Sequence, residues 1–446
     1  MKPASPPAGP ALMAAIATLV PLSLCPLWLA LLPPGGFWLA RGLAAVGGAA
    51  TLAAMAQGRD AGNRPPLVLV SPAVMLPLLA LVFYSLVPAF YVESTFGGPL
   101  PIPPGVPARV LHEQFGYYAA YAAASQAEAW VLAFACIGLL LAMAFDRIIP
   151  HRTEPDQPSP ALGWGLALVC GGGAAFQVAK TLSTLALADV LPPLVMFGMA
   201  LLSQAPIRRA PWIAAGLVAG AALLFPYHIK SLVFFSVALL LTAFCRSRGW
   251  MRIAIAAMLL LSPIAGAGAV MLPRGAIPNL AGKIVYRQSE TVFCLDFALR
   301  DAAAGGGEWR AGPFYFVSAL VPRILWPDKP SLSHGGAFSE FCGVEIPGHS
   351  ASITLLGEPA LRGGAWGMAA AGLVLAGLSA AVIAAWKRGG MIVTALALGL
   401  TPWLIDFDQH FAMYVANLAK GLLATLPVAL VIGYVTRRQA ASRASP

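Results

Sequence analysis

One short segment of the chain concentrates side chains that can bind an anion. Residues 321–330 read Val-Pro-Arg-Ile-Leu-Trp-Pro-Asp-Lys-Pro, which sets Arg323, Trp326, Asp328 and Lys329 among three prolines. Proline stiffens the backbone, and arginine and lysine bind phosphate as a planar fork and as a point charge. The segment therefore predicts a phosphate-binding loop. The alternative is a loop at a membrane surface, with Trp326 at headgroup level and the cations against lipid phosphates.

Two residues further along the chain could accept a proton from a hydroxyl group. Glu358 stands just before a long apolar stretch, where an unpaired carboxylate is costly, and His349 lies in a polar Gly-His-Ser turn. Glu358 is the first choice for a general base and His349 the second. Asp328 is a further candidate, either as base or as a partner that orients Lys329. The alternatives are that Glu358 complements the positive end of a helix and that His349 is simply solvated.

No strong motif indicates metal or redox chemistry. HExxH, CxxC and GxSxG are all missing from the sequence. Asp406, Asp408 and His410 form an Asp-x-Asp-x-His string, but no second set of ligands stands nearby, so acceptor contact or solvation is favoured. We expect no metal and no cofactor. Cys294 and Cys342 could form a disulfide in an oxidising compartment, although two separate buried thiols are the favoured alternative.

The elements that position these residues are predicted to be membrane helices. Hydrophobic residues make up 59% of the 446 and charged residues only 10%, against roughly a quarter charged in an average soluble domain. Soluble, disordered and disulfide-rich secreted proteins are thereby excluded. We expect an all-α polytopic integral membrane protein with about twelve spans of ~20 residues, at 11–33, 37–56, 66–91, 126–145, 162–181, 185–203, 211–226, 229–245, 252–272, 365–386, 391–405 and 411–435.

The short loops give the orientation. About half of the 28 basic residues fall in connections that share one side if there are twelve spans, and by the positive-inside rule that side is cytoplasmic, with both termini. The net charge of +10 is therefore largely a topology signal and predicts no nucleic-acid partner. Three parts follow: about nine helices in 1–272, a large outer loop in 273–364 that is too long for a passive connection, and about three helices with a cytoplasmic tail in 365–446.

The segment 321–330, followed by Leu356-Gly357-Glu358 and a Gly-rich run, resembles the Wzy-type oligosaccharide repeat-unit polymerases, within the bacterial polysaccharide polymerases and O-antigen ligases. That family carries a Pro-Arg, aromatic-Pro, Lys-Pro string in a large periplasmic loop, and an upstream arginine that Arg287 matches. The similarity covers roughly 280–375. In two departures, Pro359-Ala360-Leu361-Arg362 replaces aromatic and Asn residues, and His228 and Lys230 stand where relatives often carry Arg.

The resemblance implies a GT-C-like glycosyltransferase of the bacterial inner (cytoplasmic) membrane with a periplasmic active site. Such polymerases transfer a growing glycan from a polyprenyl pyrophosphate carrier to a sugar hydroxyl on the next carrier-linked repeat unit. The product is an exopolysaccharide, a capsule or an O-antigen. The implied partners are polyprenyl-pyrophosphate-linked oligosaccharides, the lipid bilayer and a chain-length regulator. Cations in the outer loop would stabilise charge on the departing oxygen. The implied catalytic residues are Arg323, Glu358, Arg287 and His349, and the implied substrate-binding residues are Lys329, Asp328, Trp326, Lys230, His228 and Arg274.

Two other functions compete with polymerisation. A ligase of the O-antigen type uses the same donor chemistry but joins the glycan to an outer-membrane lipid core. A transporter, or flippase, for a lipid-linked saccharide keeps polar groups near the bilayer midplane at repeat interfaces. Here the polar residues cluster in one outer loop instead, which favours an enzyme. At the outer membrane boundary, Lys230 could bind the carrier phosphate or simply snorkel to the surface.

Overall fold

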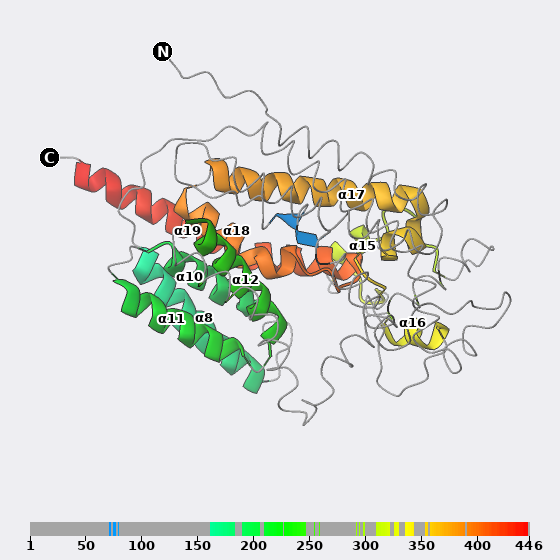
Figure 1. Ribbon diagram of the computed structural model, residues 1–446, viewed down its shortest axis with the longest axis horizontal. Coiled ribbons are helices and arrows are strands. Elements are labelled where there is room, and N and C mark those ends of the chain that lie inside the picture. The colour runs from blue at the N-terminus through cyan, green and yellow to red at the C-terminus, as the bar shows by residue number, and fades with distance from the viewer. Residues whose placement is uncertain are drawn as a thin grey trace, which may run out of the picture. The chain divides into compact units, whose positions relative to one another are not determined.

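All regular structure in the described part of the chain is helical (Figure 1). The computed structural model describes residues 161–182, 190–205, 209–225, 227–246, 309–321, 325–329, 335–342, 353–355, 357–388 and 390–444, with single positions at 71, 72, 75, 76, 79, 254, 258, 291, 294 and 298. The helices are α8 (Ala161–Thr181), α10 (Leu191–Ser203), α11 (Ala210–Leu224), α12 (Ile229–Arg246), α15 (Val317–Leu320), α16 (Gly335–Phe341), α17 (Gly357–Arg388), α18 (Met391–Leu404) and α19 (Phe411–Ala444).

Three helices of the described part are long and apolar enough to cross a membrane. They cover Ala161–Thr181, Ala369–Trp386 and Phe411–Gln439, and four shorter apolar helices accompany them. The chain is thus a helical protein with candidate membrane-spanning helices. Seven predicted ranges coincide with α8, α10, α11, α12, α17, α18 and α19. The predicted spans 11–33, 37–56 and 126–145 lie outside the described residues, as do 66–91 and 252–272 except at isolated positions.

The ends of these helices differ from the predicted ends for local reasons. α10 begins at Leu191 rather than at 185, with Pro192 and Pro193 in its first turn, where proline's missing N–H costs nothing. α17 begins eight residues before the apolar stretch. α19 runs on past the predicted end at 435 into the basic tail, through Arg437 and Arg438 to Ala444.

The chain divides into two compact units that are each described separately. Unit 1 comprises Met1–Ala144, Asn279–Gly377 and Asp406–Met413, and unit 2 comprises Phe145–Pro278, Leu378–Ile405 and Tyr414–Pro446. This division follows packing, whereas the boundaries predicted at 272 and 364 follow membrane topology and stay predictions.

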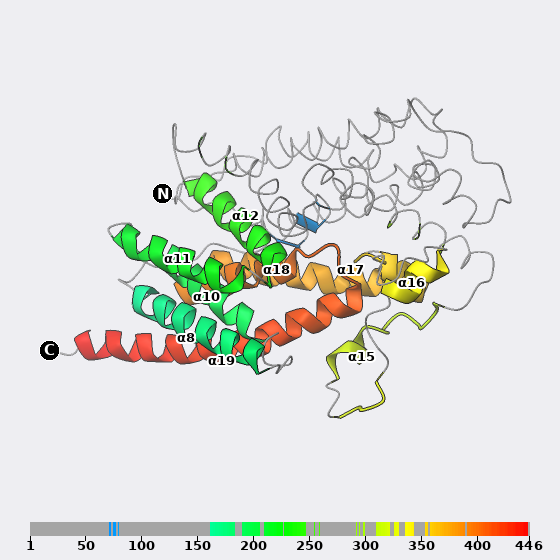
Figure 2. The same cartoon turned by 90° about the horizontal axis from the view of Figure 1, so that it is seen from below.

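Within unit 2, α10 is the central helix. It packs against α8, α11, α12 and α18, and ten of its thirteen residues are buried. α8 is buried only along one stripe that recurs every three or four residues, from Ala161 through Gly165 and Val169 to Phe176, as expected for one face of a helix. Figure 2 shows α8, α10, α11 and α18 side by side.

Glycines let the unit 2 helices approach closely. A Cβ atom at Gly165 would meet the Gly198 carbonyl at 3.0 Å and the Leu202 side chain at 2.7 Å, and a Cβ atom at Gly399 would meet the Phe197 Cα at 2.7 Å. Small residues at such contacts are typical of helix association in membranes, where close backbone packing replaces the hydrophobic effect.

In the described part of unit 1, the beginnings of α17 and α19 pack against the loop that precedes α15. The first turns of α17 and α19 lie together, because the Leu355 amide donates to the Phe407 carbonyl at 3.3 Å. The Phe316 ring, one residue before α15, meets the Phe411 ring edge-on at 5.0 Å between centroids. Chain segments around 316, 355 and 411 therefore share one core.

Candidate functional site

Glu358 is set in place by a capped helix start. The Thr354 side-chain oxygen accepts a hydrogen bond from the Gly357 amide at 2.9 Å, which satisfies one of the free N–H groups at the beginning of α17. Thr354 has φ +65°, a left-handed conformation that is unusual for a β-branched residue. Such strain is retained only where the surroundings fix it. Here it directs the chain so that Glu358 enters the first turn of α17.

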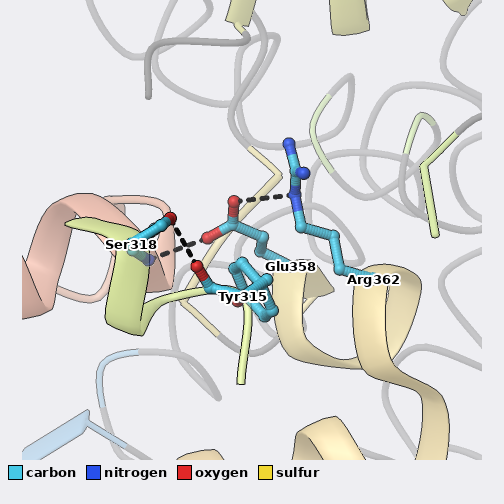
Figure 3. A network of polar contacts seen from close by, with 5 residues as sticks. Tyr315, Ser318, Glu358 and Arg362 are labelled. Carbon is cyan, nitrogen blue, oxygen red and sulfur yellow. Dashed lines mark hydrogen bonds and ion pairs between the residues drawn. The ribbon is translucent and has the colours of Figure 1, made fainter. Parts of the chain in front are cut away.

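The Glu358 carboxylate joins the first turns of α17 and α19 within unit 1 (Figure 3). Its side chain is 1% exposed. One oxygen accepts a hydrogen bond from the Ala412 amide, in the first turn of α19, at 2.9 Å. The other lies 3.1 Å from Nε of Arg362, one turn further along α17. That N–H is not aligned for a hydrogen bond, so the contact is an ion pair.

α17 is kinked two residues after Arg362. Gly364 has φ +56° and ψ −145°, a region open essentially to glycine alone, so the helix is interrupted there. The Arg362 carbonyl accepts the amides of Ala311 and Gly312 at 3.0 and 3.1 Å. A Cβ atom at Gly363 would lie 3.0 Å from the Pro313 Cα. The loop before α15 is thereby fixed against α17.

The Tyr315 side chain lies beside the Glu358–Arg362 ion pair. The Arg362 guanidinium lies 5.5 Å from the centre of the Tyr315 ring, a cation–π distance. The Ser318 hydroxyl donates to the Tyr315 carbonyl at 2.6 Å. Burial, and then the negative charge of Glu358, raise the pKa of the Tyr315 hydroxyl far above its ordinary value. Tyr315 is therefore a neutral phenol beside the carboxyl group.

Burial also controls the acidity of Glu358. It raises the pKa of Glu358 above its ordinary value, while the Ala412 amide and the Arg362 charge act to lower it. A carboxyl group with a raised pKa is better matched to proton transfer near neutral pH than an exposed one. The geometry also gives this carboxylate the alternative role, because it complements the first turn of α19.

The Lys329 side chain forms hydrogen bonds within its own loop. The side chain is 7% exposed, and Nζ donates to the carbonyls of Ala319 and Val321 at 2.9 and 2.8 Å, which closes the chain after α15. Trp326 is 40% exposed and Asp328 is also exposed. Of the predicted substrate-binding residues of this loop, Lys329 thus already uses two of its three N–H donors, while Asp328 and Trp326 are exposed.

His228 and Lys230 belong to unit 2. The His228 ring lies 5.5 Å from the Phe176 ring. Lys230 is exposed, with Nζ 5.9 Å from the centre of the Phe234 ring. Nearby, Lys180 Nζ lies 4.8 Å from the centre of the Tyr227 ring. Four further predicted site residues lie outside the described residues: Arg274, Arg287, Arg323 and His349.

Among the described residues, no three metal-ligating side chains converge. The side chains of Asp406, Asp408 and His410 thus form no such group. Asp406 is buried and accepts a hydrogen bond from the Gln409 side chain. Cys294 and Cys342 are buried and not bridged, which agrees with the alternative of two separate thiols.

Two residues of this site were not predicted from the sequence as functional. Arg362 is four positions after Glu358, a spacing that pairs opposite charges on a helix, and that signal was available. Tyr315 carries no such signal, because it lies 43 positions before Glu358. Comparison of the chain with protein-family models, with curated proteins and with solved structures gave no match.

Proposed function

We propose that this chain is an inner-membrane glycosyltransferase that polymerises polyprenyl-pyrophosphate-linked oligosaccharide repeat units, and that Glu358 is its general base. The observation that carries the proposal is a buried carboxyl group, its pKa raised by burial, in a loop region rich in arginine and lysine. The proposal further includes the twelve-span topology, the periplasmic position of the loop 273–364 and the cytoplasmic termini.

The proposed reaction needs two kinds of group. The bond between the anomeric carbon and the carrier pyrophosphate breaks, and Arg323 and Arg287 stabilise the negative charge that the leaving oxygen gains. An acceptor hydroxyl attacks the anomeric carbon and gives its proton to Glu358. Because the carboxyl group then becomes neutral, its burial favours the proton transfer.

Arg362 acts through Glu358. The ion pair at 3.1 Å holds one carboxylate oxygen, and the Ala412 amide holds the other. Each oxygen has a further lone pair that can accept a hydrogen bond. The positive charge of Arg362 acts to lower the pKa of Glu358, against the larger effect of burial.

Alanine substitution of the two arginines tests the proposal in cells. Arg323→Ala and Arg287→Ala are expected to leave the protein inserted in the membrane but to abolish long polysaccharide, so that single lipid-linked repeat units accumulate. Glu358→Gln is expected to give the same phenotype. Extracted lipid-linked glycans separated by size, with membrane protein levels from immunoblotting, provide the readout.

A matched control is Glu340→Gln, because Glu340 is an exposed carboxylate on α16 that should tolerate the change. Normal polymer from both arginine variants would overturn their assigned roles. Accumulation of full-length polymer on the carrier would indicate the O-antigen ligase instead, and accumulation of single units on the cytoplasmic face alone would indicate the flippase.

A further inference from the structure

The residues around α15 form a tight turn with two unlike edges. Several backbone N–H groups from Val317 onward donate to the carbonyl three residues earlier, as in a 3₁₀ helix, in which every third side chain shares one edge. Phe316 and Ala319 form the inner edge and are 6% and 7% exposed. The outer edge begins at Phe314 and continues through Leu320.

The outer edge is apolar and uncovered in the described part of the chain. Phe314 is 66% exposed, Val317 and Leu320 are each 48% exposed, and just beyond the turn Leu325 is 76% and Trp326 is 40% exposed. We call these five residues the α15 edge. Single exposed apolar side chains are ordinary, but a contiguous group of large ones marks an interaction surface.

The polar groups beside the α15 edge are satisfied internally. The carbonyls of Ala319 and Val321, at the end of the turn, accept hydrogen bonds from the Lys329 ammonium. Lys329 therefore turns inward, although a lysine in a water-facing loop would ordinarily extend into solvent. Unsatisfied backbone carbonyls are costly in a lipid environment, and this arrangement removes two of them.

The start of the α15 edge lies close to the beginning of the candidate membrane span of α17. Pro313, next to Phe314, abuts Gly363, and the candidate membrane span begins six residues later, at Ala369. From Ala365, the first residue after the kink at Gly364, the helix rises about 6 Å to Ala369 at 1.5 Å per residue. Trp366, between the two, is 78% exposed, and tryptophan is enriched at the membrane–water interface.

We propose that the α15 edge inserts into the interfacial layer of the bilayer in which α17 stands. The occupant is lipid rather than another protein, because the edge starts beside Gly363 of α17, and α17 exposes Trp366 just before its candidate membrane span and Leu373 within that span. Figure 2 shows α15 and its loop, in yellow-green, extending from the region of the first turns of α17. This proposal does not rest on the proposed transferase activity.

Nitroxide labels on the full-length protein test this insertion. Cysteines introduced at Val317 and Leu320, after replacement of the six native cysteines, are labelled in nanodiscs of phosphatidylethanolamine and phosphatidylglycerol. Collision rates with oxygen, which concentrates in lipid, and with a water-soluble nickel chelate report the environment of each label. Leu373 serves as the lipid-facing reference and Glu340, exposed on α16, as the water-facing one.

The expected result is an oxygen-to-nickel collision ratio at Val317 and Leu320 several-fold above that at Glu340 and close to that at Leu373. A ratio equal to that at Glu340 would overturn the proposal. A ratio that rises only when polyprenyl phosphate is added would also overturn it, in favour of the carrier chain as occupant. Spin–spin broadening in discs with two protomers, absent with one, would indicate a second copy and overturn it likewise.

A second variant avoids the cysteine replacements. The photoreactive residue benzoylphenylalanine, in place of Phe314, should form a lipid adduct on illumination in the same nanodiscs, detected as a mass increase of the intact protein. The same residue in place of Glu340 should form none. Equal adduct yields at the two positions would contradict an inserted α15 edge.

Discussion

Glu358 offers a way to separate the hydrogen-bonding and the electrostatic roles of a buried carboxyl group. Glu358→Ala removes the acceptor that binds the Ala412 amide at 2.9 Å, whereas Glu358→Gln keeps an oxygen at that position and nearly the same volume. Both substitutions remove the negative charge beside Arg362. The two variants should therefore differ in stability by the value of the hydrogen bond and the packing.

The expected sizes follow from burial. Ala412 is 2% exposed, and a buried donor left without an acceptor costs about 1–3 kcal/mol. The loss of the one buried methylene group that alanine lacks adds about 0.8 kcal/mol. Glu358→Ala should thus lower the free energy of unfolding by about 3 kcal/mol. Glu358→Gln should stay within about 1 kcal/mol of the wild type, because burial already disfavours the charge and Arg362 keeps the Tyr315 ring as a partner.

Thermal unfolding of the purified protein in detergent provides the assay, with intact protein counted by size-exclusion chromatography after heating. Glu340→Ala, at an exposed position of α16, is the control and should change stability by less than about 0.5 kcal/mol. If Glu358→Gln unfolded as readily as Glu358→Ala, the ion pair within α17 rather than the hydrogen bond to α19 would account for the stabilising effect of Glu358, and the reasoning would be refuted.

Four further outcomes are expected. Because the pKa of Glu358 is raised in the folded state, its stabilising effect is complete below the ordinary glutamate value of 4.5 and is lost as the pH rises through the folded pKa. The melting temperature of the wild type relative to Glu358→Gln should therefore fall with rising pH. Lys329→Met should destabilise the protein by about 1–3 kcal/mol, since two carbonyls lose a charged donor; a stable but inactive variant would instead indicate substrate binding alone. Gly399→Ala should cost about 1–3 kcal/mol, because its Cβ would meet the backbone of Phe197 at 2.7 Å, and Gly372→Ala, with open space around it, serves as the control in the same melting assay. Gly364→Ala should cost a similar amount through its φ of +56°, and an unchanged melting temperature would show that the kink tolerates a side chain.

Hydropathy was sufficient to predict the seven apolar helices of the described part but not the short helices α15 and α16, because burial in lipid or in a helix bundle demands apolar residues throughout a long helix. It could not predict their ends. The first turn of α17 is polar and precedes the apolar stretch, and it forms because Thr354 caps the Gly357 amide. The kink at Gly364 had only a Gly-Gly pair as its signal.

The candidate site was only partly predictable, because sequence gives chemical type but not the partner. Glu358 was identified as a candidate base from its position, yet the Ala412 amide that binds it lies 54 residues later. Lys329 was identified as a phosphate ligand because of its charge. Its ammonium instead donates to two carbonyls of the preceding turn. The sequence does not reveal these partners, since residue type alone does not distinguish an inward-facing loop lysine from an exposed one.

The central claim, glycan polymerisation, is tested most directly by turnover in a single compartment. Purified full-length protein in detergent, given only a polyprenyl-pyrophosphate-linked oligosaccharide, is expected to produce a ladder of longer lipid-linked glycans, and Arg323→Ala and Glu358→Gln are expected to produce none. Detergent solution has no second compartment, so a transporter yields no product. Recovery of unextended substrate from active, folded wild-type protein, or an undiminished ladder from both variants, would contradict the proposed reaction or its residues.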